Sequence, residues 1–206
     1  MIDRAGFPFI AAALAPGVAL AVLGRPGWAL PWFAAAAVFA FFFRDPERIP
    51  PAGDDLVVAP ADGRVLVAGD ADPAVSPPGR WLQVSIFLSP LDVHVNRIPV
   101  SGRVVRVHRA QGARLPAYRP EAAARNAHTE LWIEHGTQTI VVRQVVGILA
   151  RRLVCRVQEG DRVEAGQRFG LMKFGSRMDV FLPPSARLRV RRGQRVRAGE
   201  SVLAEL

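Results

Sequence analysis

Residues 160–167 read GDRVEAGQ and residues 193–200 read GQRVRAGE, so one pattern occurs twice in the C-terminal part of the chain. Each copy has a glycine near both ends and is followed by a second apolar stretch. Because glycine adopts turn conformations that other residues resist, each copy is predicted to form a turn, a short strand, a turn and another strand. The two copies predict a pseudo-symmetric β-sandwich or barrel with half-repeats of the biotinyl/lipoyl hammerhead kind.

Most of the chain around this repeat also has the pattern of β-structure. Short apolar or alternating stretches recur between turns rich in Gly (18 residues) and Pro (17 residues). Spacing this regular is typical of a sandwich or barrel, so the fold class is expected to be mainly β. Strands are expected at residues 56–59, 64–67, 81–88, 102–108, 129–134, 139–146 and 153–157, and one short helix at residues 120–125.

Residues 1–44 differ sharply in composition from the rest. Between residues 5 and 43 the only ionisable residue is Arg25, which separates two uncharged runs, 5–24 and 26–43. Because a membrane span needs about 20 apolar residues, residues 1–44 are predicted to form an apolar helical hairpin that attaches the chain to a membrane. Two short spanning helices and a hairpin that only enters the bilayer both remain open, since prolines interrupt the runs.

A cleavable signal peptide and a buried core hairpin are less favoured for this region. The signal peptide is disfavoured because the apolar region is long and double. The core hairpin is disfavoured because the runs lack the amphipathic period of a soluble helix. Arg4 and Arg44 flank the hairpin, which favours both of its ends lying on the cytoplasmic face of the cell membrane. The proline-rich residues 45–51 follow as a stiff linker.

The overall charge limits the choice of partner. The chain has 27 Lys and Arg against 18 Asp and Glu, a formal net charge of +9, which suits nucleic acid or anionic lipid. Nucleic acid is not expected as a partner, because the arginines are scattered among apolar residues and Tyr118 is the only tyrosine. Near an anionic membrane each cation contributes about 1 kcal/mol. The lone Cys155 excludes an internal disulfide and a cysteine-cluster metal site.

One function class follows from the repeat itself. The pattern of residues 160–167, followed by Leu171, Met172 and Lys173, is similar to biotin carriers, in which the modified lysine lies between the half-repeats. A biotin or lipoyl carrier modified on Lys173 is therefore the alternative function. Phe174 stands where carriers usually have a methionine, and the carrier pattern explains neither the hairpin nor the upstream β-structure.

A more specific resemblance involves the residues that follow. Residues 174–183, FGSRMDVFLP, resemble the processing site of phosphatidylserine decarboxylase proenzymes in their short bacterial and archaeal form. Further blocks resemble that family in the same order, so the resemblance covers nearly the whole chain. They are FFRDPER at 42–48, APADG at 59–63, SPLDVHVNRIP at 89–99, GILARR at 147–152 and EGD at 159–161.

The resemblance implies a self-processing enzyme. The catalytic domain would be residues 45–206, and the chain would cut itself between Gly175 and Ser176. The products would be a β chain, 1–175, and an α chain, 176–206. These two chains would stay together as a heterodimer, and a dimer of heterodimers remains open. Ser176 would become a pyruvoyl group, whose ketone forms a Schiff base with phosphatidylserine in the membrane. Loss of CO₂ would then give phosphatidylethanolamine, with no added cofactor or metal.

The resemblance also implies a catalytic triad. Ser176 is the nucleophile, His94 in SPLDVHVNRIP is its base, and Asp62 in APADG is the acid that orients His94. Longer members of the family have a second histidine, usually credited with self-cleavage, at the position of Arg97. His94 would therefore serve both steps, or another residue would be the cleavage base.

Three further residues are candidates for roles in cleavage or substrate binding. His128 is the next candidate for the cleavage base, because it lies near Asn126, where the family has an asparagine-rich segment. Arg97 and its neighbour Asn96 are expected to contact the substrate's phosphate or carboxylate. His108 and His135 lie in strand or turn contexts and are expected to have no catalytic role.

Overall fold

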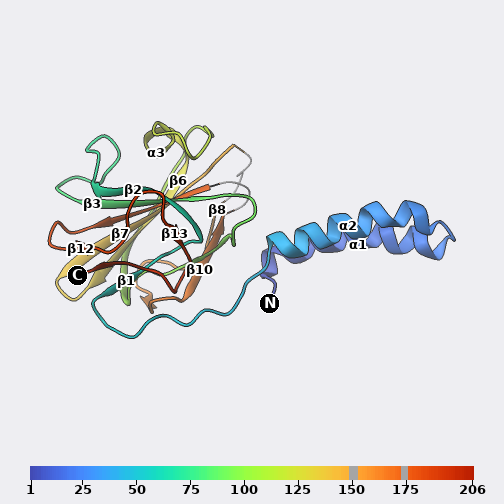
Figure 1. Cartoon of the computed structure of the whole chain (residues 1–206), viewed down its shortest axis with the longest axis horizontal. Coiled ribbons are helices and arrows are strands. Elements are labelled where there is room, and N and C mark those ends of the chain that lie inside the picture. Colours follow the sequence, from blue (N-terminus) through green and yellow to red (C-terminus); the bar gives the residue numbers. More distant parts are fainter. Residues whose placement is uncertain (149–152, 173–175) are drawn as a thin grey trace. The chain divides into compact units, whose positions relative to one another are not determined.

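The computed structural model describes residues 1–148, 153–172 and 176–206. The chain forms two compact units, Met1–Glu47 and Arg48–Leu206 (Figure 1). The first consists of helices and the second mainly of strands. The expectation of a mainly β chain with an apolar helical N-terminus is therefore confirmed.

The N-terminal unit is a helical hairpin. A 3₁₀ turn, η1 (Arg4–Gly6), leads into α1 (Phe7–Val22), and α2 (Pro26–Phe42) returns beside it. A proline begins each α-helix at its first or second position, where its missing N–H is not needed. The helices approach closely, since a Cβ on Gly17 would lie 3.0 Å from Phe33 Cε1.

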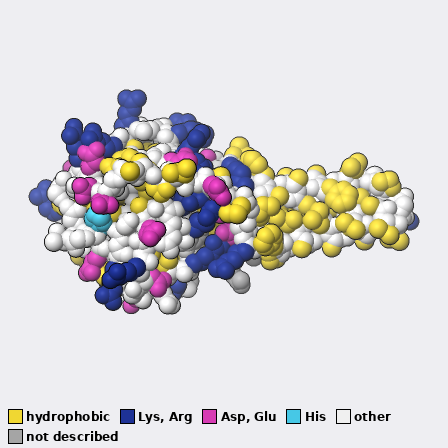
Figure 2. Space-filling view, turned by 90° about the horizontal axis from the view of Figure 1, so that it is seen from below, with side chains coloured by type: hydrophobic (Ala, Val, Ile, Leu, Met, Phe, Trp, Pro, Cys, Tyr) yellow, Lys and Arg dark blue, Asp and Glu magenta, His cyan; other side chains and the backbone are white. Residues whose placement is uncertain are grey.

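The surface of this hairpin is apolar. Figure 2 shows apolar side chains over its visible face, and Trp28 is 74% exposed. Among the described residues, Arg4–Val22 is the one helix with the length and composition to cross a membrane, with a mean hydropathy of 1.9. Only 17% of its most apolar window is buried, unlike a core helix. Helix α2 is equally apolar in character but has 17 residues. These features indicate membrane association.

The second unit is built on one curled sheet of eight antiparallel strands. The expected sandwich or barrel is thus an open half-barrel, accompanied by two sheets of three strands and the short helix α3 (Ala122–Arg125). The large sheet has the order β13 (Arg195–Val196), β2 (Gly63–Asp70), β3 (Leu82–Leu88), β11 (Ser176–Leu182), β7 (Gln138–Val145), β6 (His128–His135), β5 (Gly102–Ala110), β9 (Arg162–Val163). The small sheets have the orders β1 (Leu56–Val58), β14 (Val202–Glu205), β12 (Arg187–Leu188) and β4 (Val95–Arg97), β10 (Arg168–Met172), β8 (Leu153–Cys155).

The core lies on one face of the large sheet. Successive side chains of β11 point to opposite faces of the sheet, and those of Met178, Val180 and Leu182 lie in the core. The intervening side chains of Arg177 and Asp179 face the opposite side, yet they too are buried. Strand β11 is therefore covered on both faces, in the middle of the sheet.

The β unit consists of two equivalent halves. Read from its two edges, the large sheet has matching strand orders, β13-β2-β3-β11 and β9-β5-β6-β7. We call residues 56–88 with 176–205 the split half, and residues 95–172 the contiguous half. Equivalent backbone hydrogen bonds join equivalent residues. They are Val65 N to Gln194 O (2.9 Å) and Gly193 N to Val65 O (2.8 Å) in the split half, and Val104 N to Asp161 O (2.9 Å) and Gly160 N to Val104 O (2.7 Å) in the contiguous half.

A second repeat underlies this symmetry. Pro60 to Val65 read PADGRV and Pro99 to Val104 read PVSGRV, so each half has one copy of this pattern and one copy of the C-terminal repeat. Both segments have a register shift immediately after their GRV. In both, a Cβ on the glycine, Gly63 or Gly102, would lie 2.1 Å from a backbone oxygen of the next strand. Each segment therefore begins an equivalent strand with a β-bulge, β2 in the split half and β5 in the contiguous half.

Candidate active site

The chain crosses between the two halves at two places. Residues 89–94 lead from the split half into the contiguous half, and residues 173–175 lead back. The ends of the crossings are close together, because Met172 N donates to His94 O (3.2 Å) and Ser176 faces Leu88 across β11 and β3. His94 is the last residue of the first crossing, and Ser176 is the first residue after the second. The topology thus brings these two residues to one region.

Ser176 begins β11 and is fully buried. Its side chain shares the core face with Met178, two residues later. Its Oγ has no hydrogen-bond partner within the part of the chain that the structure describes. Leaving a buried hydroxyl unpaired costs about 1–3 kcal/mol, so such a group is unusual unless it has a chemical role. The neighbouring residues Lys173 and Gly175, predicted as carrier and cleavage residues, lie outside the described residues.

His94 is also fully buried, and its tautomer can be assigned. Its Nδ1 lies 2.9 Å from the backbone oxygen of Asp92. Because a carbonyl oxygen only accepts, Nδ1 carries the proton and Nε2 is the nitrogen that can take one up. The Asp92 carboxylate fixes the same loop by accepting from Ser89 N (2.8 Å) and lying 3.5 Å from Arg195 Nη1. This geometry fits the predicted role of His94 as a base.

Asp62 is placed at a turn of the split half. Its Oδ1 accepts from Ala198 N (2.7 Å), and its Oδ2 forms an ion pair with Arg48 (3.1 Å). The contiguous half has Ser101 at the matching position, and Ser101 Oγ accepts from Ala165 N (3.0 Å). Supporting the turn is thus common to both halves. Asp62 differs from Ser101 in carrying a negative charge and in forming an ion pair with Arg48.

Asn96 and Arg97 follow His94 on strand β4 and are buried. Arg97 Nη1 donates to Gly166 O (2.9 Å), and its Cδ lies 2.9 Å from the position of a Cβ on Gly199. The backbone N of Arg97 donates to Pro60 O (2.9 Å), which places residues 60–62 beside β4. Asn96 Oδ1 accepts from Gln144 Nε2 (2.8 Å).

Gln144 was not predicted from the sequence. It lies opposite Met178 in the β7–β11 pair, and therefore on the same face of the sheet as Ser176. A signal was present in the sequence, because Gln144 continues the alternation of the buried residues Ile140 and Val142. A polar residue at the third position of such an apolar face indicates a buried polar contact.

The alternative base, His128, lies on the other face of the sheet. His128 faces Val145 across β6 and β7, and Val145 faces Arg177 across β7 and β11. Residues directly opposite one another share a face, whereas Arg177 and its neighbour Ser176 point to opposite faces. The Nδ1 of His128 lies 3.0 Å from Asn126 O. This arrangement favours His94 over His128 as the base for Ser176.

A buried polar network holds Arg177, the residue after Ser176. Arg177 Nε donates to Asp179 Oδ1 (2.7 Å), and Nη2 donates to Ser85 Oγ (2.8 Å). A pocket of about 300 Å³ borders Arg177 on this outer face. The bond to Ser85 joins the start of β11 to β3, next to Ser176, while the bond to Asp179 orients Arg177 within β11 itself.

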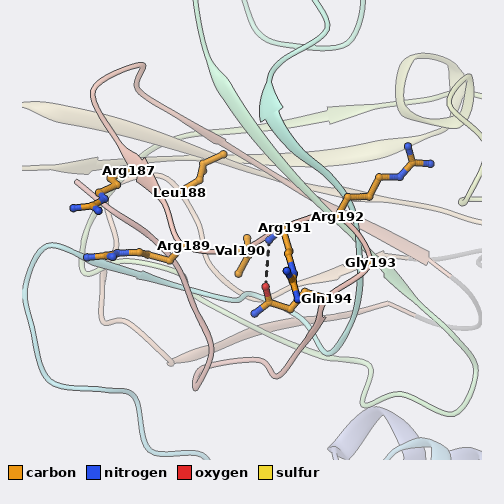
Figure 3. A pocket seen from close by; sticks show the side chains of 8 residues that line it. All are labelled: Arg187, Leu188, Arg189, Val190, Arg191, Arg192, Gly193 and Gln194. Atoms are coloured by element: carbon orange, nitrogen blue, oxygen red, sulfur yellow. Dashed lines mark hydrogen bonds between the residues drawn. The ribbon is translucent and has the colours of Figure 1, made fainter.

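A larger pocket, of about 850 Å³, lies on the surface at residues 187–194 (Figure 3). Arginines dominate its lining, and Arg189 is paired with Glu205. Gln194 Oε1 accepts from Arg191 N (3.2 Å), which shapes its wall. The lining contains neither a nucleophile nor a general base, so it is not the centre of the chemistry.

The described residues offer neither a reactive cysteine nor a group of side chains that could bind a metal ion. Burial raises the pKa of the Cys155 thiol above its ordinary value, which leaves it protonated at neutral pH and poorly nucleophilic. Across residues 1–148, 153–172 and 176–206, no three His, Cys, Asp or Glu side chains are grouped in a way that could hold a metal ion.

Comparison with known proteins identifies the family. The model of the phosphatidylserine decarboxylase family matches residues 35–204. The chain is 46% identical over 164 residues to the phosphatidylserine decarboxylase proenzyme of Pelodictyon phaeoclathratiforme, covering 80% of this chain and 77% of that protein. It is 44% identical to the proenzyme of Gluconobacter oxydans (98% and 93% covered) and 40% identical to that of Nitrosomonas europaea (100% and 95% covered). These matches do not favour the carrier alternative at Lys173. They show that the chain belongs to the phosphatidylserine decarboxylase family.

Proposed function

We propose that this chain is a membrane-bound phosphatidylserine decarboxylase, which forms phosphatidylethanolamine and CO₂ after cutting itself between Gly175 and Ser176. The observation that carries the proposal is the buried, unpartnered Oγ of Ser176 at one crossing, with the tautomer-fixed His94 at the other. The relatives' printed name, a proenzyme, supports the self-processing part.

In the first step of self-cleavage the peptide bond becomes an ester. Ser176 Oγ attacks the carbonyl carbon before it, and its proton passes to His94 Nε2. The C–O bond forms, the C–N bond breaks, and the freed nitrogen of Ser176 takes up a proton. A base then removes the Cα proton of residue 176, and the Cβ–Oγ bond breaks. This leaves a carboxylate on Gly175 and dehydroalanine at position 176, which takes up water and loses ammonia to become pyruvoyl.

The surroundings of Ser176 fit such a group. The hydroxyl that would be lost has no partner among the described residues, so its loss breaks no hydrogen bond there. Arg177 donates to Ser85, which lies in residues 1–175, so the start of the α chain keeps a contact with the β chain after cleavage. Once formed, the pyruvoyl group supplies a ketone that condenses with the substrate's amine and accepts the electron pair left by CO₂. No added cofactor or metal takes part in this scheme.

Asp62 is proposed as the acid that completes the triad with His94 and Ser176. Its support is the family resemblance and its place in the segment that runs beside β4, which His94 precedes. A nearby carboxylate would stabilise the imidazolium that forms when His94 takes the proton. The described bond from Nδ1 to Asp92 O already holds the tautomer, so the role left to Asp62 is electrostatic.

The hairpin is proposed to hold the β unit at the cytoplasmic face of the cell membrane, without a chemical role. We assign residues 1–44 to membrane attachment and residues 45–206 to catalysis, as 1–175 and 176–206 after cleavage. The halves of the β unit are assigned to the biotinyl/lipoyl hammerhead kind, which their repeated turns support. Exposing a lipid's acyl chains would cost about 0.8 kcal/mol per CH₂, so a site docked at the surface avoids a large penalty.

Mass spectrometry of the denatured protein tests the cleavage. We expect two chains, one with the mass of residues 1–175 and one with the mass of residues 176–206, the latter without a free amine at its start. The variant Ser176→Ala should stay intact. An uncut wild-type chain that still turns over phosphatidylserine would contradict the proposal.

Removing residues 1–44 tests the role of the hairpin. The shortened chain should still cut itself, because that reaction is intramolecular, and it should act on short-chain phosphatidylserine. It should act poorly on phosphatidylserine in vesicles. Equal activity of both chains on vesicles would contradict the anchoring role, and a failure to cleave would make the hairpin part of the catalytic fold.

A further inference from the structure

Asn96 and Gln144 form a buried pair of amide side chains on the same side of the sheet as Ser176. Both residues are at most 1% exposed, and Gln144 Nε2 donates to Asn96 Oδ1 (2.8 Å). Two polar atoms of the pair, Asn96 Nδ2 and Gln144 Oε1, have no hydrogen-bond partner in the described part of the chain. Leaving a buried N–H donor without an acceptor costs free energy, so this donor calls for a role that needs it.

The orientation of both amides follows from their neighbours. Gln144 Nε2 also lies 3.3 Å from Val154 O, and a carbonyl oxygen can only accept. The amide nitrogen of Gln144 must therefore lie on this side, facing Asn96. The atom of Asn96 that meets it must then be the oxygen, which directs the Asn96 NH₂ group away from Gln144. The Val154 carbonyl thus determines, through Gln144, where the Asn96 donor points.

The register of the strands brings this pair close to Ser176. Gln144 lies opposite Met178, and Ser176 is two residues before Met178 on the same face. Such diagonal neighbours in an antiparallel pair lie about 7–8 Å apart, within reach of a glutamine side chain and its partner. Asn96, in turn, is two residues after His94, in the middle of β4. The free donor, the base and the nucleophile therefore come from neighbouring positions.

We propose that Asn96 Nδ2 donates a hydrogen bond to the oxygen that becomes negative when Ser176 Oγ attacks, with Gln144 as the positioning residue. In that step the Oγ–C bond forms, the Oγ proton moves to His94, and the carbonyl π electrons move onto oxygen. A fixed donor aimed at this oxygen stabilises the charge without reorganisation. This inference rests on the proposed self-cleavage and adds the group that stabilises its transition state.

The rate of self-cleavage after a short pulse of cell-free synthesis tests the proposal. Asn96→Ala should slow cleavage roughly 100-fold, the usual effect of losing one such donor. Gln144→Glu should slow it comparably, because a carboxylate at position 144 turns the Asn96 NH₂ group toward itself. The matched control is Gln138→Glu, the same substitution at the far end of β7, where Gln138 pairs with His135 beside the hairpin turn, and it should leave the rate unchanged.

A second variant separates this role from a structural one. In Asn96→Asp the Oδ1 atom still accepts from Gln144, while an oxygen replaces the NH₂ group. That oxygen can donate only when protonated, so the ratio of the variant's cleavage rate to that of wild type should rise as pH falls. Melting temperatures in a Ser176→Ala background report whether each variant folds.

The outcomes are distinct. A wild-type chain that does not cut itself overturns the proposed function, and the inference with it. A wild-type chain that cleaves while folded Asn96→Ala cleaves at the same rate overturns the inference alone. A ratio for Asn96→Asp that does not change with pH has the same consequence, because a packing defect has no reason to follow the protonation of that oxygen.

Discussion

The contiguous half and the split half of the β unit share a scaffold but differ in chemistry. Their strands, bulges and turn hydrogen bonds correspond, including the reciprocal bonds from Val58 N to Pro99 O and from Arg97 N to Pro60 O (2.8 and 2.9 Å). The equivalent strands β1 and β4 nevertheless read LVV and VNR. The first contributes apolar side chains, whereas the second follows His94 and carries Asn96.

This difference teaches where a repeated fold can acquire a site. Positions that shape the scaffold must be alike in both halves, as Gly63 and Gly102 are. The residues that we propose to react instead lie where the repeat is interrupted, because the chain must leave one half and re-enter it. His94 ends the first crossing, and Ser176 follows the second. The two halves thus share one scaffold, and they differ at the crossings, where the chain passes from one half to the other.

The largest effect is expected from His94→Ala. Removing the base for Ser176 should slow self-cleavage by at least about 10³-fold, since a nucleophilic hydroxyl without its base loses most of its reactivity. The measurement is the fraction of the α chain, 176–206, formed over time. His135→Ala is the matched control in the same half, since His135 is bonded at Nδ1 to Ser101 O (2.8 Å), and it should cleave normally. Normal cleavage in His94→Ala with lost decarboxylation would assign His94 to the second reaction alone.

The next effect is expected from Asp62→Ser, which gives the split half the residue that the contiguous half has at the matching position. The hydroxyl can still accept from Ala198 N, as Ser101 Oγ does from Ala165 N, but the charge and the ion pair with Arg48 are lost. Cleavage should slow by about 10²-fold or more. The loss of unfolding free energy is limited, because Arg48 keeps its ion pair with Glu200 (2.8 Å). A variant that cleaves normally would reduce Asp62 to its turn-supporting role, and the two halves would be functionally alike at this position.

The scaffold itself is tested by Gly63→Ala and Gly102→Ala in the uncleaved Ser176→Ala background. In both, the new Cβ meets a backbone oxygen at 2.1 Å, so the strand must shift. We expect each to lose about 1–3 kcal/mol of unfolding free energy, or about 2–4 °C in melting temperature per kcal/mol. Gly136→Ala is the control, with open space around it and only its positive φ as a penalty. Gly63 also has a positive φ of 152°, unlike Gly102, so its loss should be the larger of the two, and a clearly larger loss at Gly102 would break the equivalence of the halves.

Much of this scaffold could be predicted from the sequence. The repeat at residues 160–167 and 193–200 predicts the matching turns, and the expected strands agree with the observed ones to within a few residues. The second repeat, PADGRV and PVSGRV, was present in the sequence but missed, because each copy is only six residues long. With both repeats in hand, the two-fold arrangement of the sheet follows.

The details of the site could be predicted less well. The family resemblance points to Ser176 and His94, but the contacts of their neighbours depend on residues distant in the chain. The orientation of Asn96 is set by Gln144, on another strand, and by the carbonyl of Val154 on a third. Local patterns of hydrophobicity contain no information on such contacts. A polar residue on an apolar strand face indicates that a partner exists, and only the folded chain identifies it.

The smallest effect is expected from Ser101→Ala in the contiguous half. This change removes the oxygen that accepts from Ala165 N (3.0 Å) and leaves the backbone unchanged. The turn is exposed, so water replaces the lost bond in part, and the loss should be about 1 kcal/mol or less. Melting of the uncleaved Ser176→Ala form should therefore fall by no more than about 4 °C. Self-cleavage of the Ser101→Ala chain should keep the wild-type rate, because Ser101 supports a turn and carries no charge. If cleavage slows as in Asp62→Ser, the turns position the reacting residues in both halves, and the charge of Asp62 loses its special role.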